Sequence, residues 1–419
     1  PPSPGAVGSP FGAETPSLSP DSPLTFPATA IPILTGGERG TPITPEELDK
    51  TDAELLREAR AIREPLERSL ALSRVAKSRI FAHKFQDAAI ALEEASQAAL
   101  LESPGLMRDL RVIAIANGFL ILAEEEMREG ATEDPFRGEP EATVPRRPED
   151  QMYWMRSAQY HYRRAAEVAG RIEDRNARSE TFFRVVKSQA TSSQDLIRNA
   201  VRSESLQGTS NARNQPLRDL ADRALLWAEG YARRIDVPVW RDQGLVFVVA
   251  SAAASGQFER GREIARNIPQ PEFRADAFIR IAETQARNGR PRDATTNYAE
   301  AARAVASIPL ADPRGILAGV LIDSLLSVGR FDDARSSVVL YPDASRQIVA
   351  LGAIAQAQGE RGLADAARAW INRDAPAEYR PLLLRRVNDG LVLAVDQVRS
   401  QILTNRAGPP ITPLRSVGP

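Results

Sequence analysis

Few residues in this sequence could perform chemistry, and they do not cluster along the chain. There is no cysteine, and the two histidines are His83 and His161. Metal sites are usually built from several cysteine, histidine or carboxylate ligands, and a thiolate nucleophile requires cysteine. We therefore expect no metal site, no disulfide and no cofactor.

Acidic residues are the remaining candidates for catalysis. Three glutamates stand together at 124–126 and two aspartates at 332–333. General acid–base chemistry needs two carboxylates held beside a substrate, whereas these runs suit a helix surface and a helix start. The sequence also lacks a Gly-rich phosphate loop, an HExxH pattern and a Ser-His-Asp order. We expect a protein that is not an enzyme, with a carboxylate hydrolase as a remaining alternative.

Charge and composition indicate which classes of partner the chain could bind. The 419 residues are 42% hydrophobic, which is enough to bury a large interior, and 54 basic residues balance 55 acidic ones for a net charge of -1. A chain without a net field attracts neither nucleic acid nor an anionic membrane surface. We expect partners to be other proteins, recognised by shape and local contacts, and no nucleic acid.

The apolar runs at 112–123 and 245–255 are too short to cross a bilayer, so we expect no membrane span in this chain. The sequence begins "PPSPG" without an initiator methionine. A cleaved export signal is one explanation, and it leaves anchoring by a preceding segment open. We expect an exported or cell-envelope location, in the periplasm or at the surface, with the cytoplasm as the alternative.

The elements that would position these residues are helices. Apolar residues recur at three- and four-residue intervals from about 45 to 402. In the second half, a glycine turn recurs at intervals of 33, 40 and 33 residues. The four copies are Gly256-Gln-Phe-Glu-Arg-Gly261, Gly289-Arg-Pro-Arg-Asp-Ala294, Gly329-Arg-Phe-Asp-Asp-Ala334 and Gly362-Leu-Ala-Asp-Ala-Ala367. Such a period predicts an all-α solenoid of roughly twelve or more helices.

Two further features repeat in step with the glycines. Apolar pairs stand seven and eight residues ahead of each one, and we expect them to form one buried stripe. An arginine also recurs, each time six residues after an isoleucine or leucine: Arg241, Arg274, Arg314 and Arg346. We expect these arginines to pair with acids or loop carbonyls between repeats. A column of arginines that binds an acidic partner is the alternative.

The segment "GRFDDA" at 329–334 resembles the turn of a tetratricopeptide repeat, in which Gly-x-aromatic-acid-acid-Ala joins two helices. Here Gly329 would permit the bend, Phe331 would pack, and Ala334 would let the helices approach. Weaker copies without the glycine are "HKFQDAA" at 83–89 and "YHYRRAA" at 160–166. The resemblance is fair across 237–371, faint across 66–200 and absent from both ends. It implies antiparallel helix pairs, with a peptide-binding surface on the first helix of each pair.

Breaks in the pattern divide the chain into segments. Proline-rich composition marks both ends, and Pro, Gly and polar clusters mark the internal breaks. We expect a Pro-rich arm or linker at 1–44, helical repeats at 45–131, an insertion at 132–149, a helical hairpin at 150–205, a loop at 206–215, tetratricopeptide-like repeats at 216–402 and a Pro-rich tail at 403–419. The array would divide into two sub-arrays near 132–149 or 206–215.

Candidate partner-binding residues follow from the resemblance, because they stand six or ten positions before the repeat glycines. They are Glu283, Asp323, Gln356, Ile279 and Val246. The lysine and asparagine with which some family members hold a peptide carboxylate are missing there, so we expect an apolar trough with two acids.

A second candidate contact surface is the aromatic and basic stretch at 152–166, which contains Tyr153, Trp154 and Tyr160. The tryptophans in general are expected to fill the core. Together these features predict a non-enzymatic interaction scaffold, a structural subunit of a larger bacterial assembly that binds through its trough and Pro-rich arm. The alternative is an accessory or regulatory subunit that binds a small ligand or peptide for an enzyme complex.

Overall fold

The computed structural model describes residues 52–131, 148–207 and 211–406. Contacts divide the chain into two compact units, 1–55 and 56–419, and only 52–55 of the first are described. The described ranges form sixteen α-helices, one short 3₁₀ segment and no strand, which confirms the all-α expectation. The predicted arm at 1–44 lies outside the described residues.

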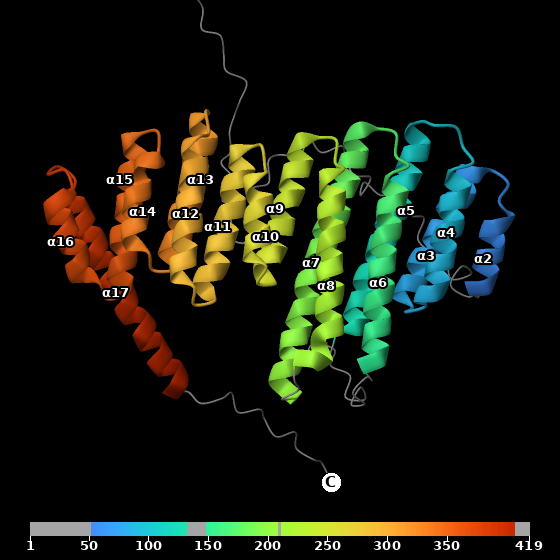
Figure 1. The fold of residues 1–419 in the computed structure, drawn as a ribbon, viewed down its shortest axis with the longest axis horizontal. Helices are drawn as coiled ribbons and strands as arrows, with labels where there is room; N and C mark the ends of the chain where they lie inside the picture. Colours follow the sequence, from blue (N-terminus) through green and yellow to red (C-terminus); the bar gives the residue numbers. More distant parts are fainter. Residues whose placement is uncertain (1–51, 132–147, 208–210, 407–419) are drawn as a thin grey trace, which may run out of the picture. The chain divides into compact units, whose positions relative to one another are not determined.

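Figure 1 shows the helices in chain order. Their bounds are α2 Asp52–Ala61, α3 Pro65–Phe81, α4 Phe85–Ala99, α5 Leu106–Gly130, α6 Pro148–Ala169, α7 Arg175–Gln207, α8 Asn211–Arg233, α9 Pro238–Ala254, α10 Phe258–Arg266, α11 Pro271–Arg287, α12 Pro291–Ala306, α13 Ala311–Ser327, α14 Phe331–Ser337, η1 Val338–Leu340, α15 Ala344–Glu360, α16 Ala364–Asp374 and α17 Arg380–Arg406.

The helices of the second unit pack in pairs. The pairs are α3 with α4, α5 with α6, α7 with α8, α9 with α10, α11 with α12, and α13 with α14, whereas α15 packs mainly against α17 and also contacts α16. We call α3, α5, α7, α9, α11, α13 and α15 the first helices. Each first helix also contacts the first helix of the next pair, and α17 packs against α15 and α16. The contacts between first helices form a continuous path from α3 to α17.

A residue in the left-handed region follows five of the first helices. Gly256, Gly289, Gly329 and Gly362 have φ values of 78°, 71°, 77° and 73°, and His83 has a φ of 56°. After α9, the Gly256 N–H donates to the Ala253 carbonyl at 2.9 Å and the Gln257 N–H donates to the Ala252 carbonyl at 2.8 Å. The same two bonds recur at the other four turns. This pairing closes a helix through a left-handed residue, and His83 takes the place of glycine.

The apolar stripe that the sequence predicts is buried in the interior. Val248, Ile281, Leu321 and Ile354, each eight residues ahead of a turn glycine, are all 0% exposed. The aromatic residue two positions after the turn is also buried in three pairs, as Phe85, Phe258 and Phe331. The small residue five positions after the turn is buried as well, and Ala294, Ala334 and Ala367 are fully covered. Small side chains at these positions allow the two helices of a pair to approach closely.

The two long breaks in the sequence lie within helix pairs. Residues 132–147 connect α5 to α6, and residues 208–210 connect α7 to α8. The segment 150–205, which we expected to form one hairpin, contains most of α6 and α7; these helices contact each other, but α6 packs mainly against α5 and α7 mainly against α8. The expected division into sub-arrays at these breaks stays a prediction. A long connection separates two helices in sequence, but their apolar faces still pack together.

Two predicted boundaries also differ. The loop expected at 206–215 is mostly helix, since α7 ends at Gln207 and α8 begins at Asn211 with Pro216 inside it. A tertiary contact supports this start, because the buried Asn214 amide donates to the Ala200 carbonyl at 3.2 Å. The helix α17 continues to Arg406, beyond the expected tail boundary at 403, and residues 407–419 lie outside the description.

Gly261 is expected to be a stabilising substitution site. It lies inside α10 at the position that alanine holds in other pairs, and an added Cβ would make ordinary contacts at 3.6–3.7 Å with Ile281 and Ala252. Gly261→Ala should raise the free energy of unfolding by about 0.5–1 kcal/mol, because helical glycine costs backbone entropy. Urea denaturation measures this change. Gly289→Ala, at φ 71°, is the matched control and should destabilise the fold.

Candidate functional site

Three of the predicted trough residues lie at the surface of the first helices. Glu283 on α11 is 26% exposed and pairs with Arg287 at 3.7 Å. The half-buried Gln356 on α15 donates to Glu360 at 3.0 Å. Asp323 on α13 lies at the surface among neighbours that partly desolvate its carboxylate, and this desolvation raises its pKa above the ordinary value. The desolvated carboxylate favours a cationic group or a hydrogen-bond donor beside it.

The structure corrects the assignment of the other two trough residues. Val246 and Ile279 are 3% and 2% exposed, so they belong to the core and present no side chain to a partner. Their neighbours Phe247 and Arg280 are half-buried at the surface instead. One residue along an α-helix turns the side chain by about 100°, which is enough to move it from the surface to the core. We call Phe247, Arg280, Glu283, Asp323 and Gln356 the first-helix surface.

An aromatic cluster adjoins this surface on α7 and α9. The ring of Phe183 lies 5.1 Å from that of Trp240 and 5.8 Å from that of Phe247, centroid to centroid. The Lys187 ammonium stands 5.6 Å from the Phe247 centroid, in a cation–π contact. All three rings are half-buried, so Trp240 departs from the expectation that tryptophans fill the core. Phe183 and Lys187 are four residues apart on α7, and Trp240 and Phe247 are seven residues apart on α9. Both spacings bring side chains to one face of a helix, a signal that glycine-based alignment does not detect.

The second predicted surface lies on α6. Tyr153 and Tyr160 are 48% and 52% exposed, whereas Trp154 is half-buried with its ring edge against Phe85 at 5.4 Å. The Tyr153 hydroxyl accepts a hydrogen bond from Gln86 of α4 at 2.9 Å. Tyr153 and Trp154 therefore connect α4 to α6. Among these three residues, Tyr160 alone makes no such contact with another helix in the described part of the chain.

A shallow groove of about 190 Å³ lies between α15 and α17. Its lining is mainly apolar, with Gln356 and Arg386 as the polar groups; the lining residues are Ile348, Val349, Gly352, Ala353, Gln356, Leu382 and Arg386. Gln356 therefore joins the groove to the first-helix surface. Val349 and Leu382 are 73% and 47% exposed, so the groove is open to solvent.

The arginine ladder contacts both acids and loop carbonyls. Arg274 donates to the Ile268 carbonyl at 3.0 Å, Arg241 bonds Asp242 at 2.9 Å, and Arg346 pairs with Asp343 at 3.4 Å. Arg314 has a buried Nε without a hydrogen-bond partner among the described residues. The contacts of Arg241 with Asp242 and of Arg346 with Asp343 are local, and Arg346 also pairs with Asp312 of α13 at 3.5 Å.

Sequence alignment on the glycines misses three further ladder members. Arg68 and Arg178 donate to the carbonyls of Ile62 and Ile172 at 3.4 and 2.9 Å, and Arg108 donates to the Arg171 carbonyl at 3.1 Å. The isoleucine six positions ahead of Arg68 and Arg178 is the same signal that marks Arg274, so the first half of the chain carried it too.

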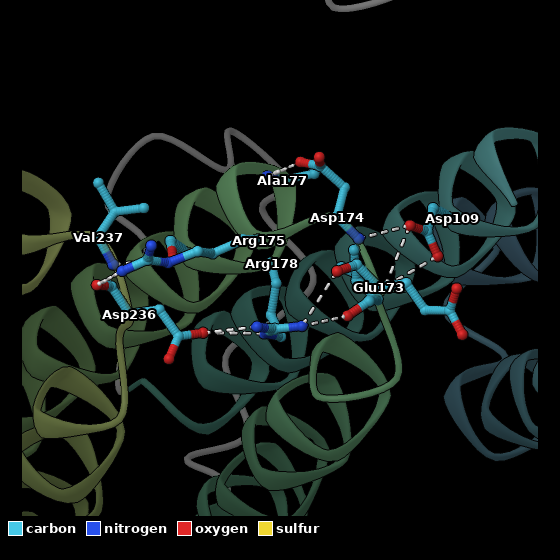
Figure 2. A network of polar contacts seen from close by, with 10 residues as sticks. Asp109, Glu173, Asp174, Arg175, Ala177, Arg178, Asp236 and Val237 are labelled. Atoms are coloured by element: carbon cyan, nitrogen blue, oxygen red, sulfur yellow. Dashed lines mark hydrogen bonds and ion pairs between the residues drawn. The ribbon is translucent and has the colours of Figure 1, made fainter. Parts of the chain in front are cut away.

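Figure 2 shows how this ladder joins consecutive loops. Arg178 on α7 donates to the loop before its own helix and pairs with Asp236 of the α8–α9 loop at 2.7 Å. Asp109 on α5 points at the α6–α7 loop, where it accepts from the Glu173 N–H at 3.1 Å and the Asp174 N–H at 2.8 Å. Asp109 is 4% exposed. A buried carboxylate therefore satisfies loop donors that would otherwise lack partners.

The two histidines are paired with glutamates of α5. His161 Nδ1 lies 2.7 Å from a Glu126 oxygen, and both side chains are buried. His83 Nδ1 lies 2.9 Å from Glu129. Within the described ranges, no group of three or more histidine, aspartate or glutamate side chains could hold a metal ion. The histidines thus join α5 to its neighbouring elements.

Tyr298 on α12 is another buried titratable group. Burial raises its pKa to about 12, and its hydroxyl shares a hydrogen bond with Ser324 at 2.9 Å. The phenol therefore stays protonated at neutral pH and links α12 to α13. It does not serve as a base in this state.

Comparisons with known proteins were made for sequence and structure. No family model and no curated protein matches the sequence. Among solved structures, the chain is similar to one described as a circular tandem repeat protein with novel repeat topology and enhanced subunit contact surfaces, with 14% identity, a TM-score of 0.28 and coverage of 87% of this chain and 91% of that chain. A likeness at this TM-score supports no conclusion on fold or function. In the parts of this chain that are described, no helix has the length and hydropathy needed to cross a membrane.

Asp109→Ala is expected to destabilise the protein by about 2–3 kcal/mol, because two loop N–H groups lose a buried acceptor. Urea denaturation measures the loss, and Asp109→Asn, which keeps one acceptor oxygen, should lose less. Asp365→Ala is the control, since the Asp365 side chain is fully exposed. Equal midpoints for Asp109→Ala and Asp365→Ala would contradict the role assigned to Asp109.

Proposed function

We propose that the protein is a non-enzymatic scaffold for protein–protein interaction, built as a tetratricopeptide-like solenoid of antiparallel helix pairs. The pairwise packing in chain order and the five left-handed turns support this architecture. Each pair buries its apolar face against its neighbours, as in repeat arrays. The surface of such an array is long and lies open to other proteins.

The aromatic cluster of Phe183, Trp240 and Phe247 is the observation that carries the proposal. Aromatic side chains dominate the binding energy of protein interfaces, because they bury a large area and lose little conformational entropy. These three rings are half-buried on adjacent first helices, so they retain surface to contribute on binding. A partner segment would bury its own apolar side chains on the rings and continue past Arg280 and Glu283.

The contacts of the titratable residues also favour a scaffold over an enzyme. His161 and Arg178 each bind a structural partner, and Tyr298 joins two helices. We place the protein in a multi-subunit bacterial assembly of the cell envelope, with the cytoplasm as the alternative location. A second candidate function, an accessory subunit that binds a small ligand, is favoured only by the groove between α15 and α17.

The double variant Trp240→Ala/Phe247→Ala tests the scaffold. Partners co-purified from the source organism are identified by mass spectrometry, and their affinity for the purified full chain is then measured by calorimetry. Loss of two anchors at roughly 1–2 kcal/mol each should weaken binding by about 30- to 1000-fold. Thermal melting shows whether the variant remains folded.

Ile90→Ala is the matched control, because Ile90 is a 51% exposed apolar residue on α4, away from the cluster. It should leave the partner's affinity unchanged. A stable monomer without any co-purified partner, or a partner whose affinity is equal for both variants, would overturn the proposal. Saturable binding of a small molecule that Gln356→Ala abolishes would favour the accessory-subunit function instead.

A further inference from the structure

Asp323 on α13 lacks the partner that its equivalent on α11 has. Glu283 and Asp323 each stand six residues ahead of a turn glycine on a first helix. Glu283 pairs at 3.7 Å with Arg287, four residues farther along the same helix. The residue four positions after Asp323 is Ser327, which is uncharged and donates its hydroxyl to a carbonyl of its own helix. In the described part of the chain, no hydrogen bond or ion pair engages the Asp323 carboxylate.

The charges around Asp323 do not compensate its carboxylate. Arg346 of α15 reaches α13 but already pairs with Asp312 at 3.5 Å and with Asp343 at 3.4 Å. The last turn of α13 contains no basic residue, so its carbonyls add to the negative potential at this end of the helix. Desolvation raises the pKa of Asp323 above its ordinary value, and no cation of the described residues offsets this effect.

Apolar and aromatic groups surround this carboxylate. Ile316 on α13 and Val349 on α15 are 45% and 73% exposed, and each stands thirteen residues ahead of a turn glycine on neighbouring first helices. The half-buried Tyr341 lies against α13, because a Cβ added at Gly319 would stand 3.0 Å from its hydroxyl oxygen. Asp323 follows Gly319 by one helical turn. We call Ile316, Gly319, Asp323, Tyr341 and Val349 the Asp323 patch.

We propose that the Asp323 patch binds a lysine or arginine side chain of a partner protein, next to an apolar residue of the same segment. This inference rests on the proposed scaffold function and specifies the chemistry of its partner. Lysine and arginine combine an apolar stem with a charged head. The stem packs on the half-buried Val320, one turn before Asp323, and the head donates to the carboxylate and to the Tyr341 hydroxyl oxygen.

Charge and shape select this occupant. An acidic segment is repelled by the carboxylate, and a purely apolar one buries the carboxylate without a hydrogen-bond donor, which costs free energy. Ile316 lies two helical turns, about 10 Å, from Asp323, so a neighbouring apolar residue of the segment reaches Ile316 and Val349. A small amine leaves most of this open surface uncovered, whereas sites for small molecules enclose most of their ligand.

Two peptides test the charge preference on the full chain. They are acetyl-Leu-Arg-Leu-amide and the same peptide with citrulline, which has the shape of arginine without its charge. Titrations followed by ligand-observed NMR at low salt should give millimolar affinity for the arginine peptide. The citrulline peptide should bind at least fivefold more weakly, because it forms no ion pair with the carboxylate. Equal affinities, or no saturable binding of the arginine peptide, would overturn the proposal.

Three variants test the position of the site. Asp323→Asn should remove the difference between the two peptides. Ser327→Arg places a cation four residues after Asp323, as on α11, and should weaken arginine-peptide binding at least threefold by occupying the carboxylate. Asp365→Asn, at a fully exposed carboxylate of α16, is the control and should retain the difference. Thermal melting checks that each variant is folded.

The remaining outcomes separate this inference from the scaffold proposal. A peptide difference that persists in Asp323→Asn would place the cation elsewhere and overturn the inference. Butylammonium that binds as tightly as the arginine peptide would make a small amine the occupant and would also overturn it. These titrations use no natural partner, so their result does not depend on the co-purification experiment with Trp240→Ala/Phe247→Ala.

Discussion

The packing of each first helix against the next is the interaction on which the rest of the structure depends. Val248, Ile281, Leu321 and Ile354 are fully buried side chains at equivalent positions of four first helices. Because each helix pair has only its neighbours to pack on, the loops between pairs are brought together as a consequence. Loop carbonyls and N–H groups then need partners, and Arg178, Arg274 and Asp109 supply them. The polar ladder therefore follows from the apolar packing.

The same dependence on neighbours explains where binding surface is left over. On α7 and α9 the inward faces are used in packing, and the half-buried rings of Phe183, Trp240 and Phe247 remain beside them. On α17, Val395 and Val398 are also exposed, and no helix pair follows them within the described residues. The aromatic cluster is the surface on which we propose that another protein binds.

Sequence reasoning located the turns but not every surface position. Gly256, Gly289, Gly329 and Gly362 were identifiable because the left-handed conformation favours glycine, whereas His83 adopts it without that signal. Val246 was assigned to the trough one position away from Phe247. A spacing counted from the turn does not fix the rotation of each helix about its axis, since that rotation depends on how the neighbouring helices pack.

Local chemistry determined the all-α class, the repeated turn and the buried stripe, because backbone conformation and apolar periodicity are properties of neighbouring residues. Tertiary structure decided which helices pair across the two long breaks, and it brought Asp109 to the loop at 173–174, more than sixty residues along the chain. It also left Val395 and Val398 of α17 exposed, whereas Leu383 and Val387 of the same helix are buried. These outcomes depend on contacts between residues far apart in sequence. Local sequence patterns do not specify such contacts, which form only when the helices pack together.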